Sequence, residues 1–250
     1  MPIKLPTQLE TFAFIAGTHQ VERLPCNTTD IESTYKGTAK LPNPYADGHL
    51  RAIHYMFTKL IGKQDFPIKE PKVLTNRYKS DAALTWLKEL QTTMLIPLIS
   101  HPMLADNPTT PQRQFLGIWR PLPTFNTFSV APHPDTIPKL MHLWLLEIST
   151  LNTEVQPHLD MAYGITKEKA HQLEQTAYNA SLFIACTQPF TDANNRLGRL
   201  VENALRLHWH LNWKSCSKDL QHEQYVKDLV EYQKRQLPNY MDRIKKLDGF

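Results

Sequence analysis

The chain has 250 residues, of which 41% are hydrophobic and 21% are charged, a composition typical of a globular protein with one large domain or two small ones. The net charge of +4 is spread along the sequence, so we expect no nucleic-acid partner. Three scattered cysteines, Cys26, Cys186 and Cys216, predict neither a disulfide framework nor a zinc site, and a reducing cytoplasm suits them best. No apolar run reaches the roughly 20 residues of a membrane span, and the N-terminus lacks the order of a signal peptide.

The common glycine-rich phosphate loops are absent from the sequence. Its 8 glycines form neither G-x-G-x-x-G nor G-x-x-x-x-G-K-[ST]. A nucleotide would therefore have to be held by another kind of turn.

Apolar residues recur at helical spacing in the first 80 residues. The spacing predicts a helix over Thr7–Glu22. The segment Thr29–Glu32 has the form of a capping box, so a second helix is expected to start there and to end before Pro42 and Pro44. A third helical pattern covers His49–Ile61.

The rest of the chain predicts more helices and one region with strand character. A helix is expected over Ser80–Leu98, with Ser80 as its N-cap. The segment Phe115–Val130 is rich in residues that favour extended backbone, but Pro121 and Pro123 exclude a central strand, so we expect an edge hairpin. Further helices are expected over residues 138–151, 167–186, 197–211 and 218–246.

Together these elements predict a mainly α fold, a single domain over residues 1–250 with one small β-hairpin. We expect an N-terminal helical part over residues 1–80, a core over residues 81–213 and one C-terminal helix within residues 214–250. Two of the core helices bracket a short polar segment, and chemistry is expected there.

That segment, QPFTDANNRLGR over residues 188–199, is dense in groups that handle a metal-bound phosphate. Asp192 is a hard oxygen ligand of the kind that Mg²⁺ accepts. Asn194 and Asn195 tolerate left-handed backbone, so the loop can turn successive N–H groups inward as an anion-binding nest. Arg196 and Arg199 lie three residues apart on one face of a helix whose N-terminus already favours negative charge. On these grounds alone, a phosphate site and a solvated cap with surface ion pairs both remain open.

The segment resembles the motif HPFx[D/E]GNGRxxR of the Fic (Fido) domain family. Six specified positions match in register and without a gap, namely Pro189, Phe190, Asp192, Asn194, Arg196 and Arg199. The departures are Gln188 for His, Ala193 for Gly and Asn195 for Gly. Residues 117–141 resemble the family's hairpin flap and the proline-rich entry to the next helix. The resemblance covers about residues 11–211 and implies the Fic helical fold with one small β-hairpin flap.

Fic enzymes typically transfer AMP from ATP to a hydroxyl of a target protein. The resemblance therefore implies ATP or another nucleotide as donor, Mg²⁺ as cofactor and an unknown target protein as partner, and it leaves an oligomer open. Asp192 would hold the metal ion, and the nucleotide-binding positions would be Asn194, Asn195, Arg196 and Arg199. The flap residues Thr124, Phe125, Asn126 and Thr127 would dock an extended target segment by strand addition.

An N-terminal segment, Thr18-His-Gln-Val-Glu22-Arg23, resembles the inhibitory [S/T]xxxE[G/N] helix that precedes the core in some Fic proteins. The resemblance makes Thr18 and Glu22 inhibitory residues. Glu22 would form a salt bridge with Arg199 and so deny the γ-phosphate its partner. Arg23 departs from the pattern, which has Gly or Asn there.

Gln188 stands where the Fic motif has the histidine that takes the hydroxyl proton. An amide can accept a hydrogen bond and orient a hydroxyl, but it cannot carry a proton away. Three hypotheses stay open: a Fic protein with weak, altered or lost AMP transfer, an active transferase of another nucleotide or phosphate-containing group with a substitute base, and a non-catalytic interaction module. His19 is a candidate substitute base, although a surface histidine is the simpler interpretation. Since Fic proteins are mostly bacterial, the resemblance implies the bacterial cytoplasm, with export to a host cell as the alternative.

Overall fold

The computed structural model describes residues 3–61, 63, 66, 84–102, 104, 112–126, 129–159, 165–216 and 220–248. The first half contains α1 (Gln8–Val21), α2 (Thr28–Tyr35), α3 (Pro44–Tyr55), the π-helical turn η1 (Met56–Leu60) and α5 (Thr85–Ser100). The second half contains η3 (Arg113–Phe115), β1 (Phe125–Asn126), β2 (Ser129–Val130), η4 (Pro134–Thr136), α6 (Ile137–Leu159), α7 (Lys167–Thr187), α8 (Asn194–His208), α9 (Leu220–Arg235) and α10 (Leu237–Asp248). The mainly α fold expected from periodicity is confirmed.

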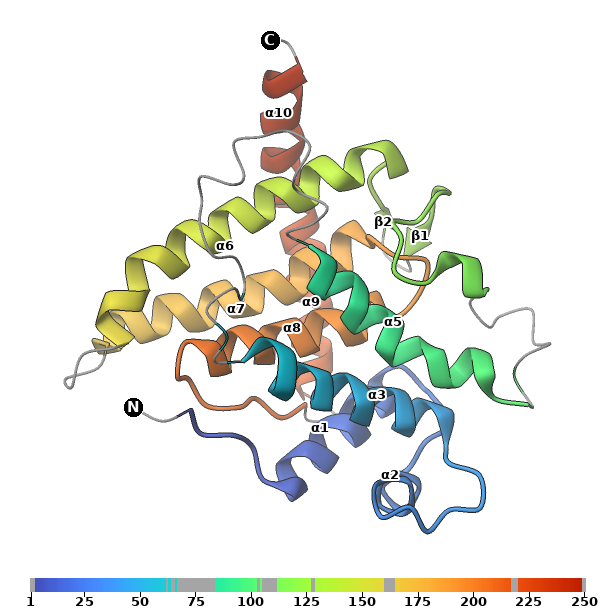
Figure 1. Ribbon diagram of the computed structural model, residues 1–250. Helices are drawn as coiled ribbons and strands as arrows, with labels where there is room; N and C mark the ends of the chain where they lie inside the picture. Colours follow the sequence, from blue (N-terminus) through green and yellow to red (C-terminus); the bar gives the residue numbers. More distant parts are fainter. Residues whose placement is uncertain are drawn as a thin grey trace.

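Helices α7 and α8 run side by side through the middle of the molecule, with α6 across one side and α1, α2 and α3 across the other (Figure 1). Every residue of α8 except Asn195 is buried, so α8 is the central helix. Two glycines allow the closest helix crossings. A Cβ on Gly198 of α8 would lie 2.7 Å from the Ser181 carbonyl oxygen of α7, and a Cβ on Gly48 of α3 would lie 2.0 Å from the Met94 carbonyl oxygen of α5.

The starts of α2 and α3 differ from the sequence predictions. The capping box of α2 is formed by Asn27 and Asp30 instead of Thr29 and Glu32, because the Asn27 side chain accepts a hydrogen bond from the Asp30 N–H and the Asp30 carboxylate accepts one from the Asn27 N–H. Pro44, expected beyond the end of a helix, is instead the first residue of α3. The N–H groups in the first turn of a helix have no partner within the helix, so proline, which lacks an N–H, fits at that position. Asn43 caps the helix.

Other boundaries also differ from the predictions, and α6 ends at Leu159, eight residues beyond the predicted end. Helix α8 begins at Asn194, three residues before the predicted start at Leu197. The predicted N-cap Ser80 lies outside the described residues, and α5 begins at Thr85. The single C-terminal helix expected within residues 214–250 is two helices, because Pro238 lacks an N–H donor and is accommodated in the first turn of a new helix, α10.

The hairpin is short. Strands β1 and β2 pair antiparallel in the register Phe125 with Val130 and Asn126 with Ser129. It lies at the same end of the molecule as the loop between α7 and α8 (Figure 1).

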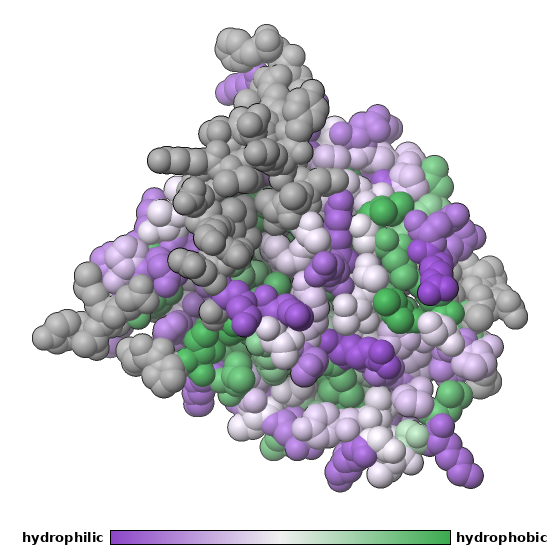
Figure 2. Space-filling model, viewed as in Figure 1, coloured by the Kyte–Doolittle hydropathy of each residue, from purple (hydrophilic) through white to green (hydrophobic). Residues whose placement is uncertain are grey.

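The surface is mixed in polarity. On the face in Figure 2, hydrophobic residues gather in small groups between hydrophilic ones and form no continuous band. Among the helices that the structure describes, none is long and apolar enough to cross a membrane.

Candidate functional site

The loop between α7 and α8 turns through two residues with left-handed backbone. Gln188 caps α7 with φ 46° and ψ 62°, and its N–H donates to the Ile184 carbonyl at 3.0 Å. Ala193 precedes α8 with φ 66°. A left-handed conformation costs an L-residue roughly 1–2 kcal/mol, so other contacts must hold the loop in this shape.

Asn194 and Phe190 supply such contacts. The Asn194 Oδ1 accepts from the Phe190 N–H at 3.0 Å, and the Asn194 Nδ2 donates to the Phe190 carbonyl at 2.8 Å. The Phe190 ring is fully buried and lies 5.2 Å from the ring of Trp119. The Asn194 amide therefore closes the loop on itself, while the neighbouring Asn195 is exposed.

Arg120 ties this loop to the hairpin, and sequence reasoning missed it. It is 2% exposed, and its Nε donates to the Gln188 carbonyl at 2.6 Å while its backbone N–H donates to the Pro189 carbonyl at 2.9 Å. Its two terminal nitrogens donate to the carbonyls of Leu122 and Pro132, which flank the hairpin. Burial lowers the pKa of Arg120. One buried cation thus fixes the hairpin base and the position of the motif's first residue relative to each other.

Of the predicted flap residues, Thr124, Phe125 and Asn126 lie at this hairpin, and Thr127 lies outside the described residues. The Thr124 carbonyl accepts from the Ala131 N–H at 3.2 Å, which closes the hairpin below the two strands.

Asp192 lies at the opening of α8 and is partly exposed. Its Oδ1 accepts from the Ala193 N–H at 2.5 Å and lies 3.5 Å from Arg196 Nη2. Both contacts use Oδ1, so Oδ2 can coordinate a cation. The side chain is 42% exposed, which leaves room for water and phosphate in the remaining coordination positions. Asp192 therefore fits the role of a single carboxylate ligand to Mg²⁺.

Glu22 from the end of α1 reaches into the same place. Its Oε2 lies 3.0 Å from Arg196 Nε, and the two side chains are only 16% and 4% exposed. A salt bridge between Glu22 and Arg199 was expected from the sequence, and this expectation is wrong. Glu22 pairs instead with Arg196, three residues earlier on the same face of α8. Burial raises the pKa of Glu22, while attraction to Arg196 and Arg199 opposes the rise.

Arg199 is buried, and its guanidinium lies over the Tyr225 ring at 4.9 Å. Among the residues that the structure describes, its Nη1 has no hydrogen-bond partner. Thr18, the other predicted inhibitory residue, is fully buried on α1, and its hydroxyl also lacks a partner within the described part of the chain. The structure thus brings both arginines and Glu22 together, with Thr18 one helical turn before Glu22.

His19 is a buried histidine, so the surface interpretation is wrong. Its Nε2 lies 2.5 Å from Nδ1 of His49 on α3, and both residues are fully buried. Burial and the nearby Arg196 lower the pKa of His19 to about 3. The pKa of His49 is also lowered, first by burial and then by His19 and both arginines. A base needs access to its substrate's proton, and this neutral pair, enclosed between α1 and α3, lacks it.

Residues 83–205 match the model of the Fic/DOC family. A crystal structure of a Fic family protein from Desulfovibrio desulfuricans G20 is similar over 93% of this chain, with 15% identity and a TM-score of 0.48. Fic-1 from C. elegans, residues 134–508, is similar over 97% of this chain, with 12% identity and a TM-score of 0.51.

The chain spans 55% of the Desulfovibrio protein's length and 68% of the C. elegans one. No curated protein matches the sequence.

Proposed function

The chain contains a Fic/DOC family domain over residues 83–205, and on this premise we propose that it binds a nucleotide with Mg²⁺ at the loop of residues 188–199. Fic domains typically transfer AMP from ATP to target proteins, so ATP is the first candidate donor. Because Gln188 replaces the motif histidine, AMP transfer is weak, altered or lost. Glu22 keeps the phosphate site closed in the conformation described above.

One observation carries the proposal, the chain of charges from Glu22 to Arg196 to Asp192. A carboxylate forms the same kind of ion pair with an arginine as a phosphate oxygen does. Glu22 is therefore a protein group standing where an anionic ligand would bind Arg196. That a carboxylate from α1 fills this position supports both parts of the proposal, an anion site at the start of α8 and a brake upon it.

Asp192 would hold the Mg²⁺ ion, which would draw the rest of its coordination shell from phosphate and water. The ion would neutralise charge on the phosphates. Arg196 and Arg199 would bind the outer phosphate oxygens, and the hairpin would align an extended segment of the target beside Gln188 by strand addition.

The site lacks a general base at residue 188. The glutamine amide can orient a target hydroxyl but has no protonation equilibrium near neutral pH. Loss of a general base commonly reduces a rate by about 10²–10⁴. The burial of His19 and its bond to His49 remove that histidine as a substitute base. A non-catalytic interaction module remains the alternative if no nucleotide binds.

The binding part is tested by calorimetric titration of ATP with Mg²⁺ into the wild type and Glu22→Gln. Freeing Arg196 from its ion pair with Glu22, a contact of about 1.5–3 kcal/mol, should tighten binding by about 10- to 100-fold. Glu32→Gln is the matched control, because Glu32 pairs with Lys36 on the surface of α2, and it should bind as the wild type does. Adding Arg196→Ala to Glu22→Gln should abolish binding. A folded Glu22→Gln variant that binds no nucleotide would contradict the proposal.

The catalytic part is tested with Gln188→His in the Glu22→Gln background, by transfer of label from α-labelled ATP to proteins of a cell extract. Histidine tolerates left-handed backbone better than most residues, so it fits the conformation at residue 188. A rise of about 100-fold or more over Gln188→Asn, which keeps an amide, would show that only the base is missing. No gain would mean that Ala193 or Asn195 also prevents transfer.

A further inference from the structure

The chain that follows α8 passes directly against α1, the helix that ends at Glu22. We call residues 212–216 the strap. A Cβ on Gly17 of α1 would lie 2.0 Å from the Cys216 carbonyl oxygen, and the Phe14 ring lies 5.0 Å from the Trp213 ring. Glycine is less favourable than alanine inside a helix, so Gly17 does not help α1 to form. Its place there is explained by the close approach of the strap.

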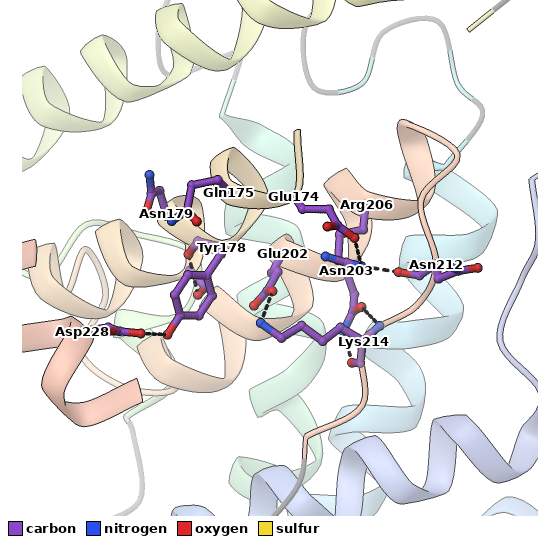
Figure 3. A network of polar contacts seen from close by, with 11 residues as sticks. Glu174, Gln175, Tyr178, Asn179, Glu202, Asn203, Arg206, Asn212, Lys214 and Asp228 are labelled. Carbon is purple, nitrogen blue, oxygen red and sulfur yellow. Dashed lines mark hydrogen bonds and ion pairs between the residues drawn. The ribbon is translucent and has the colours of Figure 1, made fainter. Parts of the chain in front are cut away.

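The strap is fastened to α8 by buried side chains, as Figure 3 shows. The Asn203 Oδ1 accepts from the Lys214 N–H at 2.8 Å, and the Asn203 Nδ2 donates to the Lys214 carbonyl at 3.1 Å. The Arg206 Nε donates to the Asn212 carbonyl at 2.7 Å, while its Nη2 donates to Glu174 of α7 at 2.9 Å. Asn203 is 2% exposed. These bonds hold the strap on the central helix, so the strap is the fixed side of its contact with α1.

Helix α8 therefore contacts α1 at two places, directly at Arg196 and through the strap at Asn203. Asn203 follows Arg196 by about two helical turns, so both residues lie on one face of α8. At the first place the Glu22 carboxylate lies 3.0 Å from Arg196 Nε. At the second place Gly17 lies against the strap. Because α1 is a continuous helix up to Val21, the position of Gly17 determines where Glu22 lies.

We propose that the strap positions Glu22 on Arg196, with Gly17 and Asn203 as the positioning residues. This inference rests on the proposed function, in which Glu22 is a brake on the nucleotide site. A methyl group at residue 17 would force α1 and the strap apart by at least about 1 Å, because non-bonded heavy atoms do not approach to 2.0 Å. Removing the Asn203 amide would free the strap from α8. Either change weakens the contact between Glu22 and Arg196 and opens the brake.

Calorimetric titration of Mg²⁺-ATP into Gly17→Ala and Asn203→Ala tests this role, each with and without Glu22→Gln. Each single variant should bind about tenfold more tightly than the wild type and no more tightly than Glu22→Gln, because it raises the fraction of molecules with a free Arg196. In the Glu22→Gln background, neither should change the affinity by more than about twofold. Gln20→Ala is the matched control, since Gln20 is an exposed residue of α1, and it should bind as the wild type does.

Urea unfolding gives a second measurement that needs no nucleotide. In the wild type, Glu22→Gln leaves Arg196 buried without its ion pair and should lower the urea midpoint. In Gly17→Ala this ion pair is already weakened, so the same substitution should lower the midpoint by less than half as much. If Gly17→Ala does not fold, Asn203→Ala serves for both measurements.

The positioning role is overturned if Glu22→Gln lowers the midpoint equally in both backgrounds or leaves it unchanged in the wild type. It is also overturned if the single variants bind Mg²⁺-ATP as the wild type does while Glu22→Gln binds more tightly, or if their gain persists in the Glu22→Gln background. A smaller midpoint loss in Gly17→Ala, together with no nucleotide binding by Glu22→Gln, would support the strap and refute the proposed function. The two proposals can therefore fail separately.

Discussion

The end of helix α1 contains a strained residue, and relieving the strain gives a quantitative test of the structure. Helix α1 ends in a Schellman motif, in which the Leu24 N–H donates to the His19 carbonyl at 2.9 Å and the Arg23 N–H donates to the Gln20 carbonyl at 3.1 Å. The motif requires left-handed backbone at Arg23, which has φ 55°. The inhibitory pattern that this segment resembles has Gly or Asn at this position, and both residues adopt left-handed backbone more readily than arginine.

The expected gain for Arg23→Gly follows from two opposing effects. Glycine removes a left-handed penalty of roughly 1–2 kcal/mol, and its greater freedom in the unfolded chain costs about 0.4–1 kcal/mol. The net stabilisation should be about 0.5–1 kcal/mol. In a domain of this size, this corresponds to a rise in melting temperature of about 1–4 °C.

Urea unfolding of Arg23→Gly, Arg23→Asn and Arg23→Ala measures this gain as a shift in midpoint at constant slope. Alanine keeps a Cβ and should gain little, and asparagine should lie between alanine and glycine. If the Arg23→Gly variant is no more stable than the Arg23→Ala variant, the backbone at residue 23 is not left-handed, and the position of Glu22 would have to be revised. Because the substitution stabilises the helix end that carries Glu22, Arg23→Gly should not bind Mg²⁺-ATP more tightly than the wild type.

Three further substitutions test how the loop and the buried histidines are held. Asn194→Ala leaves the Phe190 N–H and carbonyl unpaired and should lower the free energy of unfolding by about 2–4 kcal/mol. Asn194→Asp keeps only the acceptor, so its stability should lie between those of the wild type and Asn194→Ala. Equal stabilities of the three proteins in urea would contradict the loop geometry. Arg120→Met removes the side chain that donates hydrogen bonds to three carbonyls, and it should lower the free energy of unfolding by about 2–4 kcal/mol. Arg120→Lys should recover part of this loss. An Arg120→Met variant as stable as the wild type would refute the inference that Arg120 holds the loop and the hairpin together. His19 has a lowered pKa in the folded chain, so below about pH 6.5 the unfolded chain binds a proton at this residue, whereas the folded chain binds it only near pH 3. The free energy of unfolding should therefore fall as the pH drops from about 6.5 to about 3, by about 1.4 kcal/mol per pH unit for this histidine. Denaturation at pH 7.5 and 5 checks this, and His19→Gln should show a smaller fall than the wild type.

The fold could be predicted from the sequence wherever local patterns decide it. Helical spacing indicated the described helices, because a buried face must repeat with the helical period. Predicted helix boundaries were wrong where two local signals compete. Asn27 with Asp30 and Thr29 with Glu32 offer equivalent capping chemistry two residues apart, and only the contacts of α2 with its neighbours decide between them. The start of α8 was missed because Asn194 lies inside the helix while its side chain bonds back to Phe190.

The site could be predicted only as far as it is continuous in sequence. A linear motif places Asp192, Arg196 and Arg199 near one another by helix geometry alone. The choice of Arg196 as the partner of Glu22 depends on how α1 crosses α8, and no local pattern encodes that crossing. Arg120 and Gln188 are 68 residues apart, and sequence spacing does not relate them.

Within the described ranges of the chain, the contacts that hold the loop do not involve the side chain of residue 188. Arg120 binds the carbonyl of Gln188, Asn194 binds the backbone of Phe190, and the left-handed turns at residues 188 and 193 are backbone features. A histidine or a glutamine therefore meets the same backbone, and the replacement alters proton transfer without requiring the loop to refold. Binding and chemistry are thus separable at this site. For that reason, nucleotide affinity after release of Glu22 and transfer activity after Gln188→His test independent parts of the proposed function, and either can succeed where the other fails.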